Sequence, residues 1–168
     1  MAKKAIYSET DHVPLRTDPY LEYLVFPFAH GDLTANGVQH SAQITTSAAA
    51  FTEVESATIE PPIDGTIIEV QLSLTGRFQS SGATKDVKFK WQARDKDGTY
   101  VDLHTEVTLA ADASALAEHT YSGVFAPTTN FLLVPFDIRL VIQREDATEE
   151  AKGETKNSSW VKVKYSRP

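Results

Sequence analysis

Strict alternation of apolar and polar side chains along two neighbouring segments is the feature that most constrains this fold. Between Ile68 and Phe78 the aliphatic and aromatic residues fall on one parity and the polar residues on the other. From Val87 to Arg94 the same pattern returns. Because successive side chains of a strand point to opposite faces, both segments are predicted to be β-strands with one face on a core and one toward solvent.

Weaker strand patterns lie on both sides of these segments. Residues 20–28 are rich in aromatic and aliphatic side chains, but Pro27 cannot donate to a ladder, so this strand is expected at a sheet edge or bulge. Gly76 falls on the apolar parity, which indicates either a bulge or a close neighbour. The remaining expected strands lie in 42–59, where the alternation is weak, and in 101–109, 120–125, 131–144 and 158–165.

The sequence pattern predicts almost no helix. The window 110–119 is the only candidate, and at about two turns it is too short to be stable alone, so a loop is expected. Residues 145–157 are charged and lack large apolar side chains, so they are expected to form a solvated hairpin tip.

About eight strands without intervening helices favour an all-β fold, an antiparallel sandwich of two sheets. The length of 168 residues suits a jelly roll better than an immunoglobulin-type domain of about 100 residues. Two prolines and the lack of a sustained period near the amino terminus predict an extended arm. We therefore expect an N-terminal arm over 1–20 and a single β-sandwich domain over 21–168.

Composition excludes several kinds of site. The chain has no cysteine, so disulfides, cysteine-ligated zinc, iron–sulfur clusters and thiol catalysis are ruled out. A net charge of −7 argues against binding nucleic acid or an anionic membrane by bulk electrostatics. No segment has the length of a membrane helix or the apolar core of a signal peptide.

Catalytic motifs are not recognisable either. There is no Gly-x-Ser-x-Gly elbow and no glycine-rich phosphate loop, so neither an enzyme nor a bound cofactor is expected. His30, Asp32 and His40 loosely resemble a set of metal ligands, but their polar, glycine-containing surroundings favour a solvated loop. No metal site is therefore predicted.

Four aromatic residues are the candidate contacts to a partner or a glycan. Trp160 shares a parity with two lysines, and Tyr100 is expected to point away from the core, so either ring could stack on a sugar. The same rings could instead cap the core or meet a neighbouring subunit. Tyr20 and Tyr23 follow the arm and could order on a partner or fold back as part of an edge strand.

Two stretches of the chain carry a family resemblance. They are Ile63-Asp64-Gly65-Thr66-Ile67-Ile68-Glu69-Val70, which leads into the long strand, and Trp91-Gln92-Ala93-Arg94-Asp95-Lys96-Asp97-Gly98, which combines a strand with a hairpin turn. Together with a lysine-rich closing strand, they resemble the small jelly-roll structural proteins of tailed-phage virions, including capsid decoration and accessory proteins. The resemblance implies a non-enzymatic subunit that self-associates on a capsid or similar lattice.

The leading hypothesis is therefore a structural protein of a virion, assembled in the host cytoplasm without a signal peptide. It would form a homo-oligomer and contact a capsid or other virion protein, using buried apolar patches and strand addition by the arm. The alternative hypothesis is a carbohydrate-binding β-sandwich module.

Overall fold

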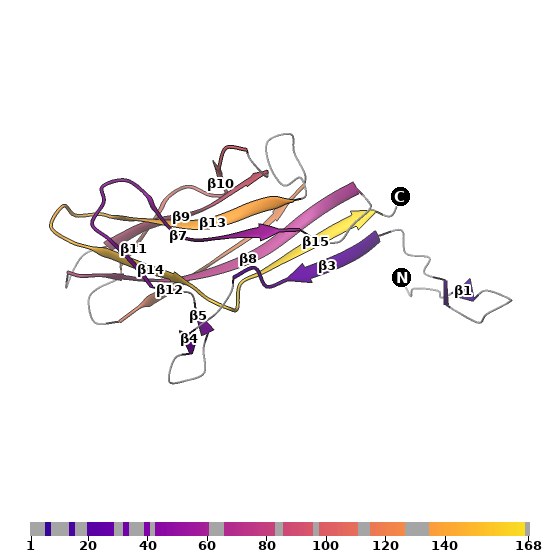
Figure 1. Ribbon diagram of the computed structural model, residues 1–168, viewed down its shortest axis with the longest axis horizontal. Helices are drawn as coiled ribbons and strands as arrows, with labels where there is room; N and C mark the ends of the chain where they lie inside the picture. The colour runs from indigo at the N-terminus through magenta and orange to yellow at the C-terminus, as the bar shows by residue number, and fades with distance from the viewer. Residues whose placement is uncertain are drawn as a thin grey trace.

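The computed structural model is a sandwich of two antiparallel sheets (Figure 1). It describes residues 6–7, 14–15, 20–28, 32–33, 39–40, 43–60, 66–82, 86–95, 98–110, 115–126 and 135–166. Within these ranges every regular element is a strand. None of the described segments forms a helix long and apolar enough to cross a membrane. The all-β sandwich predicted from the alternation is confirmed.

Eleven strands make up the two sheets. The six-stranded sheet contains β3 (Tyr20–Val25), β6 (Ile44–Thr46), β8 (Thr66–Ser80), β12 (Ala117–Phe125), β14 (Ala151–Thr155) and β15 (Trp160–Ser166). The five-stranded sheet contains β7 (Thr52–Ile59), β9 (Asp86–Asp95), β10 (Val101–Asp102), β11 (Val107–Ala110) and β13 (Phe136–Arg144). Two short hairpins pair β1 (Ile6–Tyr7) with β2 (Pro14–Leu15) and β4 (Asp32–Leu33) with β5 (Gln39–His40).

The strand order is that of a jelly roll. Strand β3 pairs with β15, β7 with β13, β8 with β12 and β9 with β11, so the chain forms a nested antiparallel ribbon. The ribbon closes into two sheets where β15 joins β8 and β13 joins β9. Eleven strands fill eight positions, because β3 and β6, β14 and β15, and β10 and β11 each share one line in a sheet.

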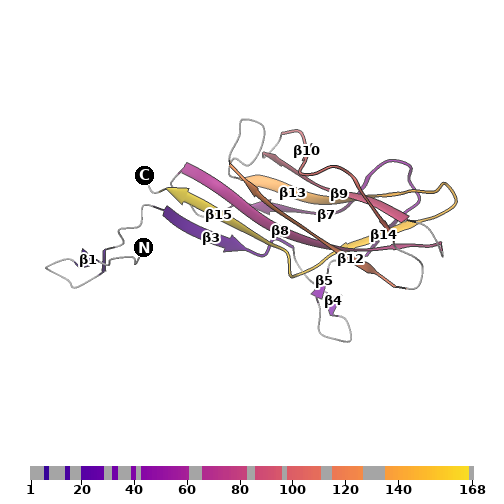
Figure 2. The ribbon, with the colours of Figure 1, turned by 180° about the vertical axis from the view of Figure 1, so that it is seen from behind.

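The core lies between the two strands with the clearest alternation. Phe78 of β8 stacks on Phe89 of β9 with ring centroids 4.1 Å apart, and Phe28 packs against the fully buried Trp91. Figure 2 shows β8 and β9 in different layers, as this contact requires. Burying each side chain of this size contributes about 1.5–3 kcal/mol to stability. The predicted inward parity is confirmed for β9 and for β8 from Val70 to Phe78. It is wrong at Ile68, because the register shift between β8 and β15 skips this residue and places Ile67 against the core instead.

Gly76 has a close neighbour, which is one of the two alternatives that its position left open. A Cβ atom built there would lie 2.5 Å from the Phe78 ring and 3.2 Å from Leu140 of the opposite sheet. The β8–β12 register runs past Gly76 without a shift, so the glycine marks close packing and no bulge.

The expectation of a solvated tip over 145–157 is wrong for its second half. Residues 151–155 form β14, which lies between β8 and β6 with Ala151 and Gly153 buried. Gly153 packs so closely that a Cβ there would lie 3.0 Å from Ile142. Small side chains carry little hydropathic signal, so the sequence pattern did not reveal this strand.

Candidate functional site

The outer face of the five-stranded sheet is occupied by pairs of opposite charge. Each pair joins side chains from adjacent or nearby strands, with nitrogen–oxygen separations of 2.9 to 3.5 Å. Asp137 is the most enclosed of the acids, since Thr58 also donates a hydrogen bond to it at 2.7 Å. The pairs are Lys88–Glu106, Lys90–Asp102, Arg94–Asp137 and Arg139–Glu53.

Tyr100 lies within this network. The guanidinium carbon of Arg139 is 3.7 Å from the centre of its ring, and that of Arg94 is 4.4 Å away. Burial raises the pKa of the Tyr100 hydroxyl, although the nearby Arg94 charge opposes that rise. The ring predicted as a partner or glycan contact is therefore engaged in cation–π contacts within its own chain.

Gln92 connects two of the pairs beneath this surface. Its amide donates to Asp102 at 2.6 Å, and its carbonyl accepts from Arg139 at 2.9 Å. Burial alone raises the pKa of Asp102, but the hydrogen bonds from Gln92 and Lys90 outweigh it, and the net pKa is lowered. Asp102 is accordingly held as a carboxylate on this face.

The outer face of the six-stranded sheet presents apolar side chains instead. Leu24, Phe26 and Val124 are 52, 59 and 63 % exposed, and among the described residues they are the large hydrophobic side chains classed as exposed. Leu24 lies opposite Lys162, and Val124 lies opposite Gln71. Because opposed residues of antiparallel strands point to the same side, and the parity between them is buried in the core, these side chains face outward.

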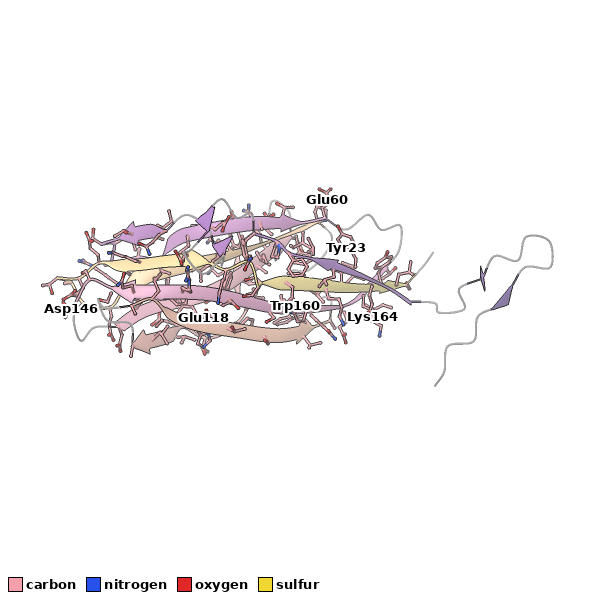
Figure 3. The ribbon with its side chains drawn as sticks, turned by 90° about the horizontal axis from the view of Figure 1, so that it is seen from below. Tyr23, Glu60, Glu118, Asp146, Trp160 and Lys164 are labelled. Atoms are coloured by element: carbon pink, nitrogen blue, oxygen red, sulfur yellow. The ribbon has the colours of Figure 1, made fainter. Side chains whose placement is uncertain are left out.

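Two rows of outward residues cross this sheet. The first row is fully defined by strand register and contains Leu24, Lys162, Gln71 and Val124. In the second row Trp160 lies opposite Ser73, which lies opposite Ser122, and continuing the β3–β15 register by one residue places Phe26 beside Trp160. We call these eight residues the Trp160 face; Figure 3 labels Trp160 at one end of β15 and Lys164 toward the other.

Trp160 has the orientation that its parity predicted. It is half-buried and alternates with the buried Val161 and Val163. Tyr23 differs, because it lies opposite Val163 and points toward the space between the sheets, half-buried. Tyr20 begins β3 opposite Ser166, and its side chain lies outside the described residues.

Charge returns at the β14 end of the same sheet. Arg77 forms an ion pair with Glu154, whose side chain is only 2 % exposed. Glu118 lies opposite Arg77 on β12 and accepts a hydrogen bond from Lys156. The apolar surface is therefore confined to the half of the sheet built around β15.

Two histidines lie where β12 meets the five-stranded sheet. His104 accepts a hydrogen bond from the Trp91 amide at 3.0 Å through Nε2, and its Nδ1 lies 2.7 Å from the Thr105 carbonyl oxygen. That pattern assigns the proton to Nδ1, and the ring joins two backbone groups. His119 packs edge-on to Phe89, and burial together with the nearby His104 lowers its pKa. These contacts are structural.

The described residues contain no group of histidine and acidic side chains that could hold a metal ion. Strands β4 and β5 place Asp32 opposite His40 in the backbone register. The side chains of His30, Asp32 and His40 lie outside the described residues, so the loose metal motif is not tested.

No known family model matches the chain, and no curated protein matches it. Solved structures do resemble it. A chain from infectious bursal disease virus, Gx strain, gives a TM-score of 0.51 at 12% identity, over 98% of this chain and 37% of that one. The Gt strain gives 0.50 at 10% identity, over 98% and 38%. Latent PorU of Porphyromonas gingivalis gives 0.53 at 9% identity, over 89% and 13%.

These comparisons show the fold alone, since the identities are low and the chain spans less than half of each matched chain. A viral β-sandwich is among the neighbours, as the sequence resemblance implied. Neither of the two viral structures described above is from a tailed phage.

Sequence reasoning missed most of both outer faces. Leu24 and Phe26 lie in a segment that was recognised as a strand, and their outward direction follows from sharing a parity with Glu22. The outward direction of Val124 follows in the same way, because it shares a parity with Ser122. The ion pairs had no such signal, because Arg94 and Asp137 are far apart in sequence and meet only through the β9–β13 register.

Proposed function

We propose that this chain is a non-enzymatic structural subunit that self-associates through the Trp160 face as part of a virion shell. One observation carries the proposal: the exposed large apolar side chains of the described residues all lie on this face. The opposite outer face carries its charges in internal pairs. Clustered apolar side chains in water favour association, because burying them removes apolar area from solvent.

The composition of the face suits a contact between subunits. Leu24, Phe26 and Val124 supply apolar area. Lys162 and Gln71, which lie between Leu24 and Val124 in the first row, supply polar groups. Interfaces commonly combine an aromatic centre with a polar surround. Fully burying one side chain the size of Phe26 is worth about 1.5–3 kcal/mol.

The viral likeness supports a shell role. A virion shell is built from many copies of few proteins, and a rigid sandwich with one apolar outer face suits such packing. In this role the chain would assemble in the host cytoplasm and act as a capsid, decoration or accessory protein. The arm over 1–20 would add a second tie to neighbouring subunits, alongside the domain over 21–168.

Light scattering coupled to size exclusion tests self-association directly. The full chain is expected to run as a defined oligomer, and Phe26→Glu is expected to weaken its association at least tenfold, which is about 1.4 kcal/mol. Ala147→Glu makes the same charge change at an exposed position on the hairpin tip and should leave the mass unchanged. Deleting residues 1–20 should leave the sandwich folded and reduce assembly. A full chain that stays monomeric at every concentration would overturn the proposal.

A carbohydrate-binding role is the second candidate, favoured by the surroundings of Trp160. Its neighbours across the sheet are Ser73 and Ser122, whose hydroxyl oxygens lie 3.4 Å apart. An aromatic ring next to hydroxyl groups is a common arrangement for stacking and hydrogen bonding a sugar. Affinity electrophoresis in soluble polysaccharides should show retention that Trp160→Ala abolishes and Tyr100→Ala leaves intact. Equal migration of all three proteins in every polysaccharide would exclude this role.

A further inference from the structure

We infer that β12 is a docking edge for β12 of a second copy, so that two six-stranded sheets join through a two-fold axis. This inference rests on the proposed self-association and specifies one contact within it. Among the described strands, only β8 pairs with β12, so along Ala117–Val124 the other side of the strand offers its backbone groups to a partner. An unpaired, regular edge is a template for strand addition.

Strand β12 lacks the features that protect other edges. It has nine residues, pairs with β8 without a register shift, and contains no proline, lysine or arginine. Edge strand β7 is paired across an irregularity at Leu140/Val141 and carries Glu53 and Glu55. The other edges are shorter: six residues in β3, four in β11, three in β6 and two in β10. Short edges, charges and bulges discourage pairing with another chain.

The register of the contact follows from the strand itself. Two antiparallel copies pair symmetrically over Glu118–Val124 when the axis passes through Tyr121, the midpoint of β12. Residue i of one copy then lies opposite residue 242 − i of the other. This register also keeps the inward side chains of both copies on one side of the joined sheet, because opposed residues share a parity.

Side chains in this register are compatible. On the inward side Phe125 would lie opposite Ala117, His119 opposite Gly123, and the two Tyr121 rings opposite each other, an aromatic pair of the kind that stabilises adjacent strands. On the outward side Glu118, the single charged residue of β12, would lie opposite Val124. No like charges are opposed, although the chain carries a net charge of −7. Opposed like charges would have disfavoured the pairing.

The contact also has a consequence for assembly. A two-fold contact used alone gives a dimer and nothing larger, because each copy buries the surface that a third copy would need. A shell therefore needs a different second contact, and the Trp160 face lies on the same sheet without including the backbone edge of β12. Together, the edge and the face provide two kinds of contact.

Single cysteines can test the register, because the natural chain has none. Thr120→Cys and Ser122→Cys are prepared separately, oxidised alone or mixed, and separated on non-reducing gels. The register places residue 120 opposite residue 122 of the partner, whereas equivalent positions are diagonal neighbours about 7–8 Å apart. Disulfides rarely bridge Cα atoms more than about 7 Å apart. The mixed sample should therefore form at least several-fold more cross-linked dimer than either variant alone.

Ala147→Cys on the exposed tip gives the background of collisional cross-linking. An oligomer by light scattering with no excess cross-link in the mixed sample would overturn the β12 contact and leave the proposed function standing. A monomer by light scattering with background cross-linking only would overturn both. Circular dichroism on each reduced variant confirms that the sandwich is folded before it is scored.

Discussion

The two outer faces of this sandwich are formed by strands with the same alternating pattern, but they carry different kinds of side chain. On the five-stranded sheet, outward lysines and arginines meet acids on neighbouring strands, and Tyr100 packs under two guanidinium groups. On the β15 half of the six-stranded sheet, the outward positions include Leu24, Phe26 and Val124, which have large exposed fractions. Both faces belong to strands with buried inner sides, so the core alone does not explain the contrast.

The difference shows on which face the side chains already have their interaction partners within one chain. A charge already paired inside the chain gains little from a partner and loses hydration on being covered. An exposed apolar side chain has no such hydration to lose and gains about 25 cal/mol for each Å² removed from water. Substitutions on the charged face should therefore act on folding, and substitutions on the Trp160 face should act on association.

The largest expected effect tests what sets the loss of stability when a charged side chain is removed. We expect the burial of the side chain to decide it, and not the sheet that carries it. Glu154→Gln removes the partner of Arg77 at a site only 2 % exposed, so the free energy of unfolding should fall by about 3–5 kcal/mol. Glu118→Gln, in the exposed ion pair with Lys156 on the same face, should cost less than about 1 kcal/mol. Urea unfolding followed by fluorescence measures both. Equal losses from the two variants would contradict the role of burial.

An intermediate effect tests the charged face itself. Asp137→Ala leaves Arg94 and Thr58 without their shared acceptor, so the free energy of unfolding should fall by about 1.5–3 kcal/mol. The association constant should not change, because this face is not a contact in the proposal. Leu24→Ser is the counterpart on the Trp160 face, and it should change folding by less than about 0.5 kcal/mol while weakening association. The comparison would fail if Asp137→Ala weakened association and Leu24→Ser lowered the free energy of unfolding.

The smallest expected effect is at His119, whose side chain packs against Phe89 of the opposite sheet. Burial and the neighbouring His104 lower its pKa below the ordinary value of 6.5, so the unfolded chain binds a proton that the folded chain resists. Stability should be unaffected by this group above pH 6.5 and should decrease as pH falls below it. Thermal unfolding from about pH 7.5 to about pH 5.5 should show a drop that His119→Gln reduces. An identical pH dependence in both proteins would exclude this contribution.

Much of the fold could be predicted because its signal is local. The inward and outward sides of β9, and of β8 from Val70 onward, were correctly assigned. For Gly76 the sequence left a bulge and a close neighbour open, and the structure has the close neighbour. Strand β14 was missed because alanine and glycine are buried there by their surroundings. The outward direction of Trp160 was also predicted, whereas the partners of Tyr100 were not.

By itself, the sequence determined the all-β class, the two long amphipathic strands and which side chains of each strand share a face. Those properties follow from the two-residue period of a single strand. Only the tertiary structure decided that Arg94 reaches Asp137, that Tyr100 lies against two arginines, and that Leu24 and Val124 share one row across β15 and β8. These relations depend on strand order and register, which bring together residues far apart in the chain and which no local pattern encodes.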